Sequence, residues 1–354
     1  MEKEKLTFIK NFNPIWFATV LGFGGIALAT IHMARFFNIG WLKPVTAILA
    51  YGNLALCLFL FALWILRAVL NYSVMVSDLS HPVFAGFHSL MPAALVMVSL
   101  NFSKIGSVVP LCNHGGIAIV FWAAGALFEV VLLTLTCYYL VNNQTISINN
   151  VNGGWLVPPV AALLTALAGL GMMPFVTDTW TLTVVLWVNF FFFGNGAFIM
   201  LLITIFLFYR LFFSEKILPQ LFSSVWILLV PFSLISLLFP MLADAMSLLF
   251  PKYGFAFTGI AMVMSPVMTA IGLWLLVLLI MMTYHYMTFV KLPFGLSWWA
   301  FVFPTASLSI ACLSYSLVAN QPLFGYAGAV VYFFLLAVTA VVIIRTILYY
   351  LRNH

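Results

Sequence analysis

Charged residues are scarce in this sequence. Asp, Glu, Lys and Arg make up only 6% of the 354 residues, and just 7 of them are acidic. Soluble domains carry about a quarter charged residues, so this composition excludes a soluble globular protein. Hydrophobic residues reach 65%, and the mean hydropathy is +1.19. The chain is therefore predicted to be a polytopic, all-α integral membrane protein with the lipid bilayer as a partner.

The motifs of enzymes are also missing. The sequence has no HExxH, no Gly-rich phosphate loop and no acidic pair at helical spacing within an apolar run. The 4 cysteines form no CxxC pair, so we interpret them as small apolar side chains rather than metal ligands or disulfides. We predict that the protein is not an enzyme and has no catalytic residue, metal, cofactor or nucleic-acid partner.

Ten apolar runs are long enough to cross a bilayer, which takes about 20 helical residues. The predicted spans are 14–34, 45–70, 83–100, 115–141, 155–175, 182–212, 221–241, 255–289, 297–318 and 325–351. The stretches between them are short. Residues 1–354 are thus expected to form a single transmembrane domain, with residues 1–13 as a short cytoplasmic tail.

The distribution of Lys and Arg predicts the orientation. With the N-terminus in the cytoplasm, 9 of the 13 basic residues lie inside, which the positive-inside rule favours. An even number of spans also requires both termini on one side. We expect a protein of the plasma membrane with both termini cytoplasmic. The four basic residues on the outer face are Arg35, Lys43, Lys104 and Lys252.

Proline and glycine concentrate in the odd-numbered runs, whereas the second, fourth, sixth and tenth have no internal proline. The eighth run, with Pro266, is the exception. A broken backbone is tolerated at membrane depth only where protein or a water-filled cavity satisfies it. The pattern predicts five helical hairpins around a central pore, with the odd-numbered helices inside. The alternative is that glycine and proline are simply common in membrane helices.

The ninth run begins with an aromatic pair, Trp298 and Trp299, as at a membrane interface, and contains Pro304, which is expected to bend the helix. At helical spacing one face is small and weakly polar apart from the ring of Phe303. Such a face packs against a neighbouring helix or borders a water-filled path. The residues on this face are Ala300, Phe303, Ser307, Ala311 and Ser314.

Four stretches resemble one known family. WWAFVFP (298–304) resembles the ninth helix of the tellurite-resistance/dicarboxylate transporter family, which includes malic acid permeases, sulfite pumps and plant slow anion channels. PIWFATVLGFGGIAL (14–28), HPVFAGFHSLMPAAL (81–95) and GGWLVPPVAALLTALAG (153–169) are similar to its first, third and fifth helices. The seventh run shows no family motif beyond its prolines.

The resemblance implies a channel or carrier for small anions: a C4-dicarboxylate such as malate, or chloride, nitrate, sulfite or tellurite. It also implies a homotrimer with one pore per subunit, and a gate at Phe303. Without the resemblance, Phe303 is one of 36 phenylalanines and is interpreted as a core or lipid-facing ring.

An anion path can be built from helix N-termini, hydroxyl donors and the positive edges of aromatic rings. The predicted pore-lining residues are Thr19, Gly22, Gly25, Ser89, Pro92, Pro158, Thr165, Pro231, Pro304 and Ser307. Arg35 and Lys104 are predicted to attract anions at the outer mouth, or else are ordinary loop charges.

Glu129 is the acid that lies clearly inside a predicted span. An intramembrane carboxyl suggests function by default, so Glu129 with His88 is a candidate for proton coupling in a dicarboxylate symporter. The alternative is a structural hydrogen bond between helices. The scarcity of other acids along the path disfavours cation transport. A further alternative is a membrane-embedded enzyme or lipid-binding protein.

Overall fold

The computed structural model describes residues 12–79, 84–106 and 113–353. In these ranges ten helical segments are long and apolar enough to cross a membrane. They are Pro14–Phe36, Leu42–Leu70, Ala85–Ile105, His114–Asn142, Gly153–Phe175, Thr179–Phe213, Pro219–Leu249, Pro251–Val290, Leu296–Ala319 and Pro322–Arg352. The predicted number of spans is confirmed, and most boundaries agree to within a helical turn. His81, Pro82 and Val83 of the third-helix motif lie outside the described residues.

The seventh span is longer than predicted. We expected it to end at Met241, with Asp244 in a loop or at a helix end. Instead α10 (Leu229–Leu249) continues past both Pro240 and Asp244. Asp244 is exposed, so its carboxyl needs no buried partner and does not stop the helix.

The five odd-numbered spans share an unusual construction. In each, a 3-10 turn leads directly into the main α-helix, and in the seventh span the short helix α9 (Pro219–Phe222) precedes this turn. The pairs are η1 (Pro14–Trp16) with α2 (Phe17–Phe36), η2 (Ala85–Ser89) with α5 (Leu90–Ile105), η4 (Gly153–Leu156) with α7 (Val157–Met172), η6 (Ser223–Leu228) with α10, and η9 (Leu296–Phe301) with α12 (Val302–Ala319). Pro304 lies in the first turn of α12, just after the change from 3-10 to α geometry, and the bend expected there stays a prediction.

The even-numbered spans are mostly continuous α-helices. They are α3 (Leu42–Leu70), α6 (His114–Asn142), α8 (Thr179–Phe213), α11 (Gly254–His285) and α13 (Pro322–Asn353). Shorter elements are α4 (Tyr72–Leu79), α9 (Pro219–Phe222), the 3-10 turns Ile148–Asn150, Met173–Phe175 and Pro251–Tyr253, and a π-helical turn at Tyr286–Val290.

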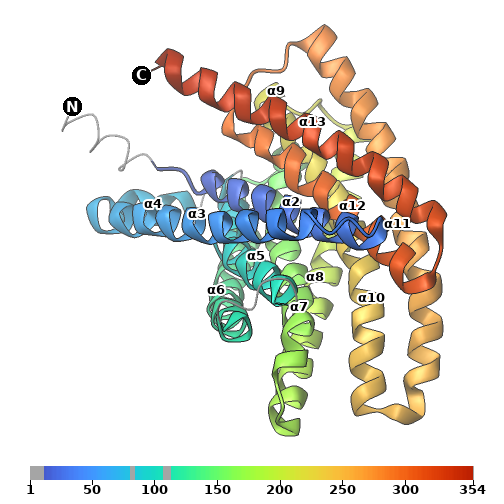
Figure 1. Cartoon of the computed structure of the whole chain (residues 1–354). Helices are drawn as coiled ribbons and strands as arrows, with labels where there is room; N and C mark the ends of the chain where they lie inside the picture. The colour runs from blue at the N-terminus through green and yellow to red at the C-terminus, as the bar shows by residue number, and fades with distance from the viewer. Residues whose placement is uncertain (1–11, 80–83, 107–112, 354) are drawn as a thin grey trace.

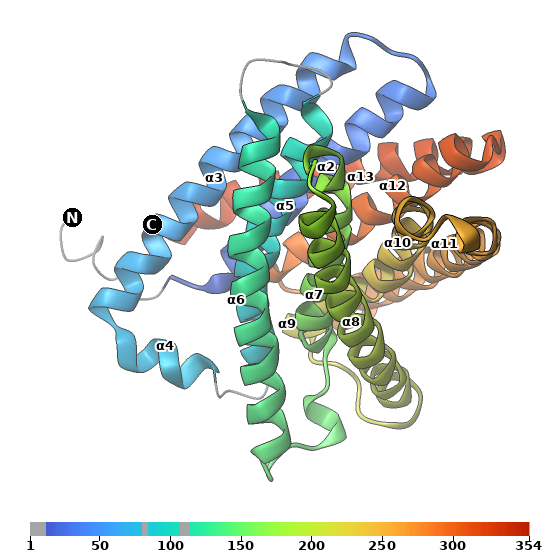
Figure 2. The same cartoon turned by 90° about the horizontal axis from the view of Figure 1, so that it is seen from below.

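The odd-inside, even-outside arrangement is confirmed. In the apolar windows of the odd-numbered spans 72–100% of residues are buried, against 22–39% in the even-numbered spans. Helices α2, α5, α7, α10 and α12 contact one another in a closed ring, and each outer helix packs on the inner helix that precedes it. The α10–α11 hairpin is at the lower right of Figure 1. Figure 2 shows α6 and α8 on the near side of the molecule, outside α5 and α7.

Buried amides tie the first two hairpins together. Asn53 of α3 donates to the side-chain oxygen of Asn101 of α5 (3.1 Å), and Asn101 donates to the carbonyl of Gly24 in α2 (3.0 Å). Helices in lipid gain little from the hydrophobic effect between them, so such hydrogen bonds and close backbone packing stabilise their association.

Candidate functional site: an apolar cavity among the inner spans

The five 3-10 turns form a closed ring, in which each contacts the next: η1, η2, η4, η6, η9 and back to η1. An outer helix returns the chain after every inner span, so all five inner spans begin at the same end of the bundle. We call this end the N-terminal face. Glycines allow the turns to approach: a Cβ on Gly153 would lie 1.8 Å from the carbonyl oxygen of Ser224, and one on Gly86 would lie 2.3 Å from that of Gly154.

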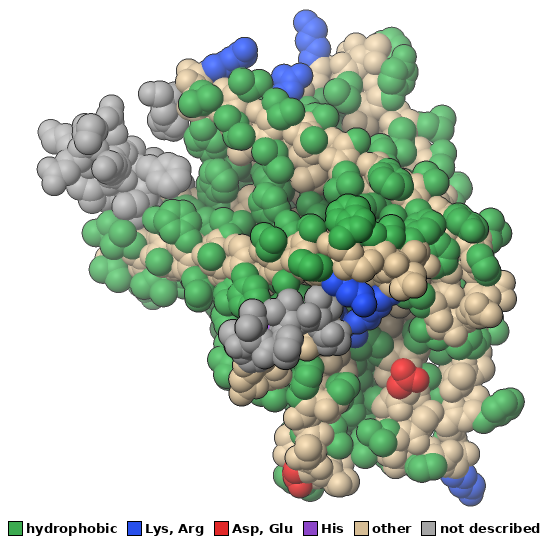
Figure 3. Space-filling view, viewed as in Figure 1, with side chains coloured by type: hydrophobic (Ala, Val, Ile, Leu, Met, Phe, Trp, Pro, Cys, Tyr) green, Lys and Arg blue, Asp and Glu red, His purple; other side chains and the backbone are tan. Residues whose placement is uncertain are grey.

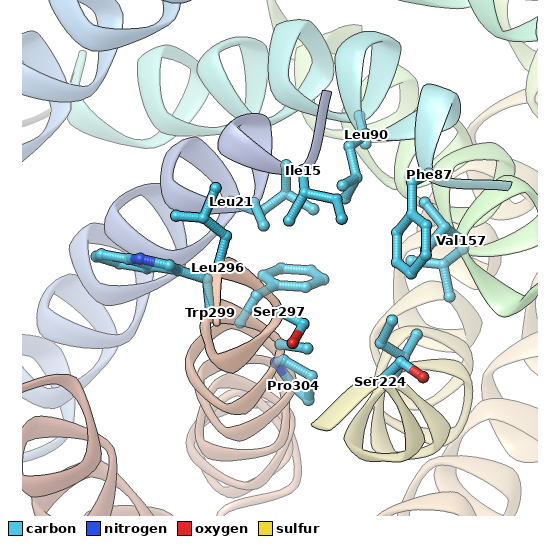
Figure 4. A pocket seen from close by; sticks show the side chains of 16 residues that line it. Ile15, Leu21, Phe87, Leu90, Val157, Ser224, Leu296, Ser297, Trp299 and Pro304 are labelled. Carbon is cyan, nitrogen blue, oxygen red and sulfur yellow. The ribbon is translucent and has the colours of Figure 1, made fainter. Parts of the chain in front are cut away.

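A narrow cavity of about 40 Å³ lies within this ring, and every inner span contributes to its wall. This volume holds only a few water-sized spheres. Figure 4 shows Ile15 and Leu21 on one side of it, Phe87 and Val157 on another, and Ser224, Ser297 and Pro304 below. The lining residues are Ile15, Ala18, Leu21, Phe87, Leu90, Ala93, Val157, Val160, Ser224, Ile227, Leu296, Ser297, Trp299, Ala300, Phe303 and Pro304.

The wall of this central cavity is almost entirely apolar. Its two hydroxyls already donate within the protein: Ser224 to the carbonyl of Leu221 (2.6 Å), and Ser297 to that of Gln220 (3.3 Å). The indole of Trp299 extends away from the middle of the cavity (Figure 4) and packs on Phe23 of α2. Apolar constrictions can gate a channel by dewetting, which opposes the passage of ions.

Two phenylalanines line the cavity. Phe303 at the start of α12 is 6% exposed and packs close to Gly25 of α2. Phe87 of η2 presents its ring to the cavity beside Val157 (Figure 4). Sequence reasoning singled out Phe303 and missed Phe87. Phe87 could have been identified from its position between Gly86 and Pro92, two helix-breaking residues of an inner span.

The predicted pore-lining residues fall into two groups. Pro304 lines the cavity, whereas the others are buried in the inner spans without bordering it. The hydroxyls of Thr19, Thr165 and Ser307 donate to carbonyls of their own spans. Their role in an open path stays a prediction. The members of the second group are Thr19, Gly22, Gly25, Ser89, Pro92, Pro158, Thr165, Pro231 and Ser307.

The predicted outer-mouth residues lie at the opposite end from the ring of turns. Arg35 is exposed in the last turn of α2, and Lys104 is half-buried in the last turn of α5. Each lies within electrostatic range of the other and of His32, whose Nδ1 is 2.8 Å from the carbonyl of Leu28. In the view of Figure 3, which is that of Figure 1, few charged side chains lie among the apolar side chains at the surface.

A second, more polar cavity of about 150 Å³ lies at the N-terminal face. Arg67 of α3 and Asp78 of α4 form an ion pair in its wall, with Nη2 of Arg67 2.6 Å from Oδ2 of Asp78. Asp78 lies in the last turn of the short helix α4. The lining residues are Phe12, Asn13, Pro14, Arg67, Asp78, Phe84, Phe87 and His88.

Glu129 lies on the inward face of α6 and is fully buried. The hydroxyl of Ser89, at the end of η2, is its polar neighbour. Within the described part of the chain, neither oxygen of the Glu129 carboxyl has a hydrogen-bond partner within 3.5 Å, and neither does Nε2 of His88. Glu129 thus lies close to Ser89, the residue after His88, but the Glu129 carboxyl forms no hydrogen bond with His88.

Ten spans around an apolar cavity define an all-α integral membrane protein. The sequence profile of the voltage-dependent anion channel family matches residues 11–347, and the chain belongs to this family. The resemblance seen in the four motifs is thereby confirmed. Anion transport is the general function of the family, so the chain is a transporter or channel and not an enzyme.

Two proteins of Methanocaldococcus jannaschii, both described as uncharacterized transporters, are similar over nearly their whole lengths. One is 30% identical over 349 residues, which cover 96% of this chain and 95% of the relative. The other is 29% identical over 347 residues, which cover 97% of this chain and 95% of the relative.

Proposed function

We propose that this protein conducts small anions along the axis of its five inner spans and that the ring of Phe303 closes the path. The observation that carries the proposal is the place of Phe303 in a cavity to which all five inner spans contribute. The substrates that we propose are a C4-dicarboxylate such as malate, or chloride, nitrate, sulfite or tellurite. We further propose one transmembrane domain per chain, a homotrimer with one pore per subunit, and a plasma-membrane location with cytoplasmic termini.

The chemistry of the central cavity supports a gated path rather than a tight binding site. A full positive charge within it would hold an anion strongly and slow its release. The wall carries no Lys or Arg, and its hydroxyls are engaged with carbonyls. The barrier is therefore apolar and steric, and removing one large ring is expected to lower it.

The experiment is anion flux into liposomes that contain the purified protein. Chloride and malate are compared, with and without a pH gradient, for the wild type and Phe303→Ala. The matched control is Phe191→Ala, because Phe191 is 50% exposed on α8 and away from the path. Flux that is driven by the anion gradient and raised only by Phe303→Ala supports the proposal. Unchanged flux in a correctly folded Phe303→Ala protein contradicts the gate.

A second candidate function is proton-coupled dicarboxylate symport through Glu129 and His88. The observation that favours it is the full burial of Glu129 without a hydrogen-bonded partner among the described residues. An isolated carboxylate is costly in such a site, so the group is expected to hold a proton. Symport requires uptake that depends on the pH gradient, which distinguishes it from the passive path in the same liposomes.

A further inference from the structure

The polar cavity at the N-terminal face and the central cavity share one aromatic lining residue. Phe87 lines both cavities. A volume of about 150 Å³ is large enough for several water molecules or one small anion. An ion held in this cavity would thus lie beside a residue that also lines the central cavity.

Among the described residues, the charges in the wall of this cavity balance. Arg67 is only 4% exposed, and a buried guanidinium requires an anionic partner. Asp78 supplies that partner through the 2.6 Å ion pair. The pair is neutral overall, so a further anion entering alone would leave an uncompensated buried negative charge, which is unfavourable.

His88 provides the compensation. It is 2% exposed and its Nδ1 lies 3.3 Å from the carbonyl oxygen of Ala85. A carbonyl only accepts, so Nδ1 carries a hydrogen and donates it. The other nitrogen, Nε2, is buried and has no hydrogen-bond partner among the described residues. On a neutral ring this Nε2 is an acceptor, and on a protonated ring it becomes a donor that can hold an anion.

We propose that this cavity binds one small monovalent anion together with one proton on Nε2 of His88. The proposal rests on the proposed function, because it supplies a binding site at one end of the anion path. The proton and the anion together add no net charge beside the Arg67–Asp78 pair. By linkage, protonation of His88 strengthens anion binding and the bound anion strengthens protonation to the same extent.

In the described part of the chain, few other ionisable groups face His88. Asp78 of α4 and Arg67 of α3 act on it across the cavity, and Glu129 of α6 lies beside the adjacent Ser89. The other elements packed on η2 are η1, η4, α5 and α7, and among these only α5 carries an ionisable side chain, Lys104 at its far end. The titration of Asp78 and Glu129 must therefore be distinguished from that of His88.

The test is isothermal titration of the purified full-length protein with chloride at fixed pH values from 4 to 8. Each titration is repeated in two buffers of different ionisation heat, so that proton uptake is measured directly. We expect uptake approaching one proton per chloride at the upper end of this range, where the chloride affinity falls about tenfold per pH unit. Chloride binding without proton uptake in the wild type, or no chloride binding, overturns the proposal.

Variants assign the effect to residues. His88→Asn is expected to abolish the proton uptake and the pH dependence. The matched control is His114→Asn. His114 is also buried but lies at the opposite end of the bundle, so this substitution is expected to leave the proton uptake and the pH dependence of chloride binding unchanged. Proton uptake on chloride binding that persists in a folded His88→Asn protein contradicts the assignment of the proton to His88.

Flux measured on the same samples separates the two proposals. Anion flux through Phe303→Ala liposomes without proton-linked chloride binding refutes this site and leaves the proposed function standing. Proton-linked binding without flux supports the site and counts against the conducting path.

Discussion

The ring of Phe303 lies against the backbone of Gly25. A Cβ on Gly25 would be 3.4 Å from Cδ2 of Phe303 and 2.9 Å from the Cβ of Ala306. The residue proposed as the gate is thus positioned by the close approach of α2 and α12, which depends on the absence of a side chain in α2. Such small-residue contacts let membrane helices approach closely.

Gly25→Ala is therefore expected to destabilise the protein. The added methyl group meets the Cβ of Ala306, which cannot rotate away, so the helices must separate at a cost of about 1–3 kcal/mol. The measurement is the midpoint of thermal unfolding in detergent. In Gly194→Ala, where a Cβ would find nothing within 4 Å, we expect an unchanged or slightly higher midpoint. Equal midpoints for the two variants would show that the contact is not tight.

Phe87→Ala is expected to raise anion flux through the proposed path, independently of Phe303. Phe87 closes the cavity from η2, and removing its ring widens the same apolar constriction. An increase of about tenfold corresponds to a barrier lowered by about 1.4 kcal/mol. The control is Phe198→Ala, because Phe198 is 63% exposed on α8. A flux equal to wild type in folded Phe87→Ala would leave Phe303 as the single closing ring.

Gly153→Ala is expected to prevent correct folding. Its Cβ would lie 1.8 Å from the carbonyl oxygen of Ser224, and backbone atoms cannot yield as a flexible side chain does. The contact joins η4 to η6, so the ring of 3-10 turns must open, at a cost of about 3 kcal/mol or more. The measurement is the yield of monodisperse protein after extraction. Gly259→Ala, with nothing within 4 Å of the added Cβ, should be extracted as well as wild type.

Glu129→Gln is expected to retain folding and anion flux. Glutamine has the shape of a protonated glutamic acid, and the buried carboxyl of Glu129 is expected to hold its proton. The measurement is malate and chloride uptake as a function of the pH gradient. Loss of a wild-type dependence on the pH gradient in this variant would favour the symporter instead. A dependence that survives would remove Glu129 from proton coupling.

The number of spans, their approximate ends and their inner or outer places followed from local properties of the sequence. Apolar length sets whether a helix crosses the bilayer. Gly and Pro mark the spans whose backbone must be satisfied by protein, such as Gly153–Phe175, whose apolar window is fully buried. The predicted end of the seventh span at Met241 was wrong, because α10 continues to Leu249. An exposed acid such as Asp244 is compatible with a helix.

The direction in which each inner residue faces was decided by the tertiary structure. An inner span is apolar on all sides because every side is buried, so its sequence pattern does not mark the face toward the axis. The motif around Phe303 identified one lining residue, but Phe87 and Ile15 are equally apolar in sequence and line the same cavity. The pairing of Arg67 with Asp78 beside His88 also required the fold, because α3, α4 and η2 meet only once the hairpins pack into a ring.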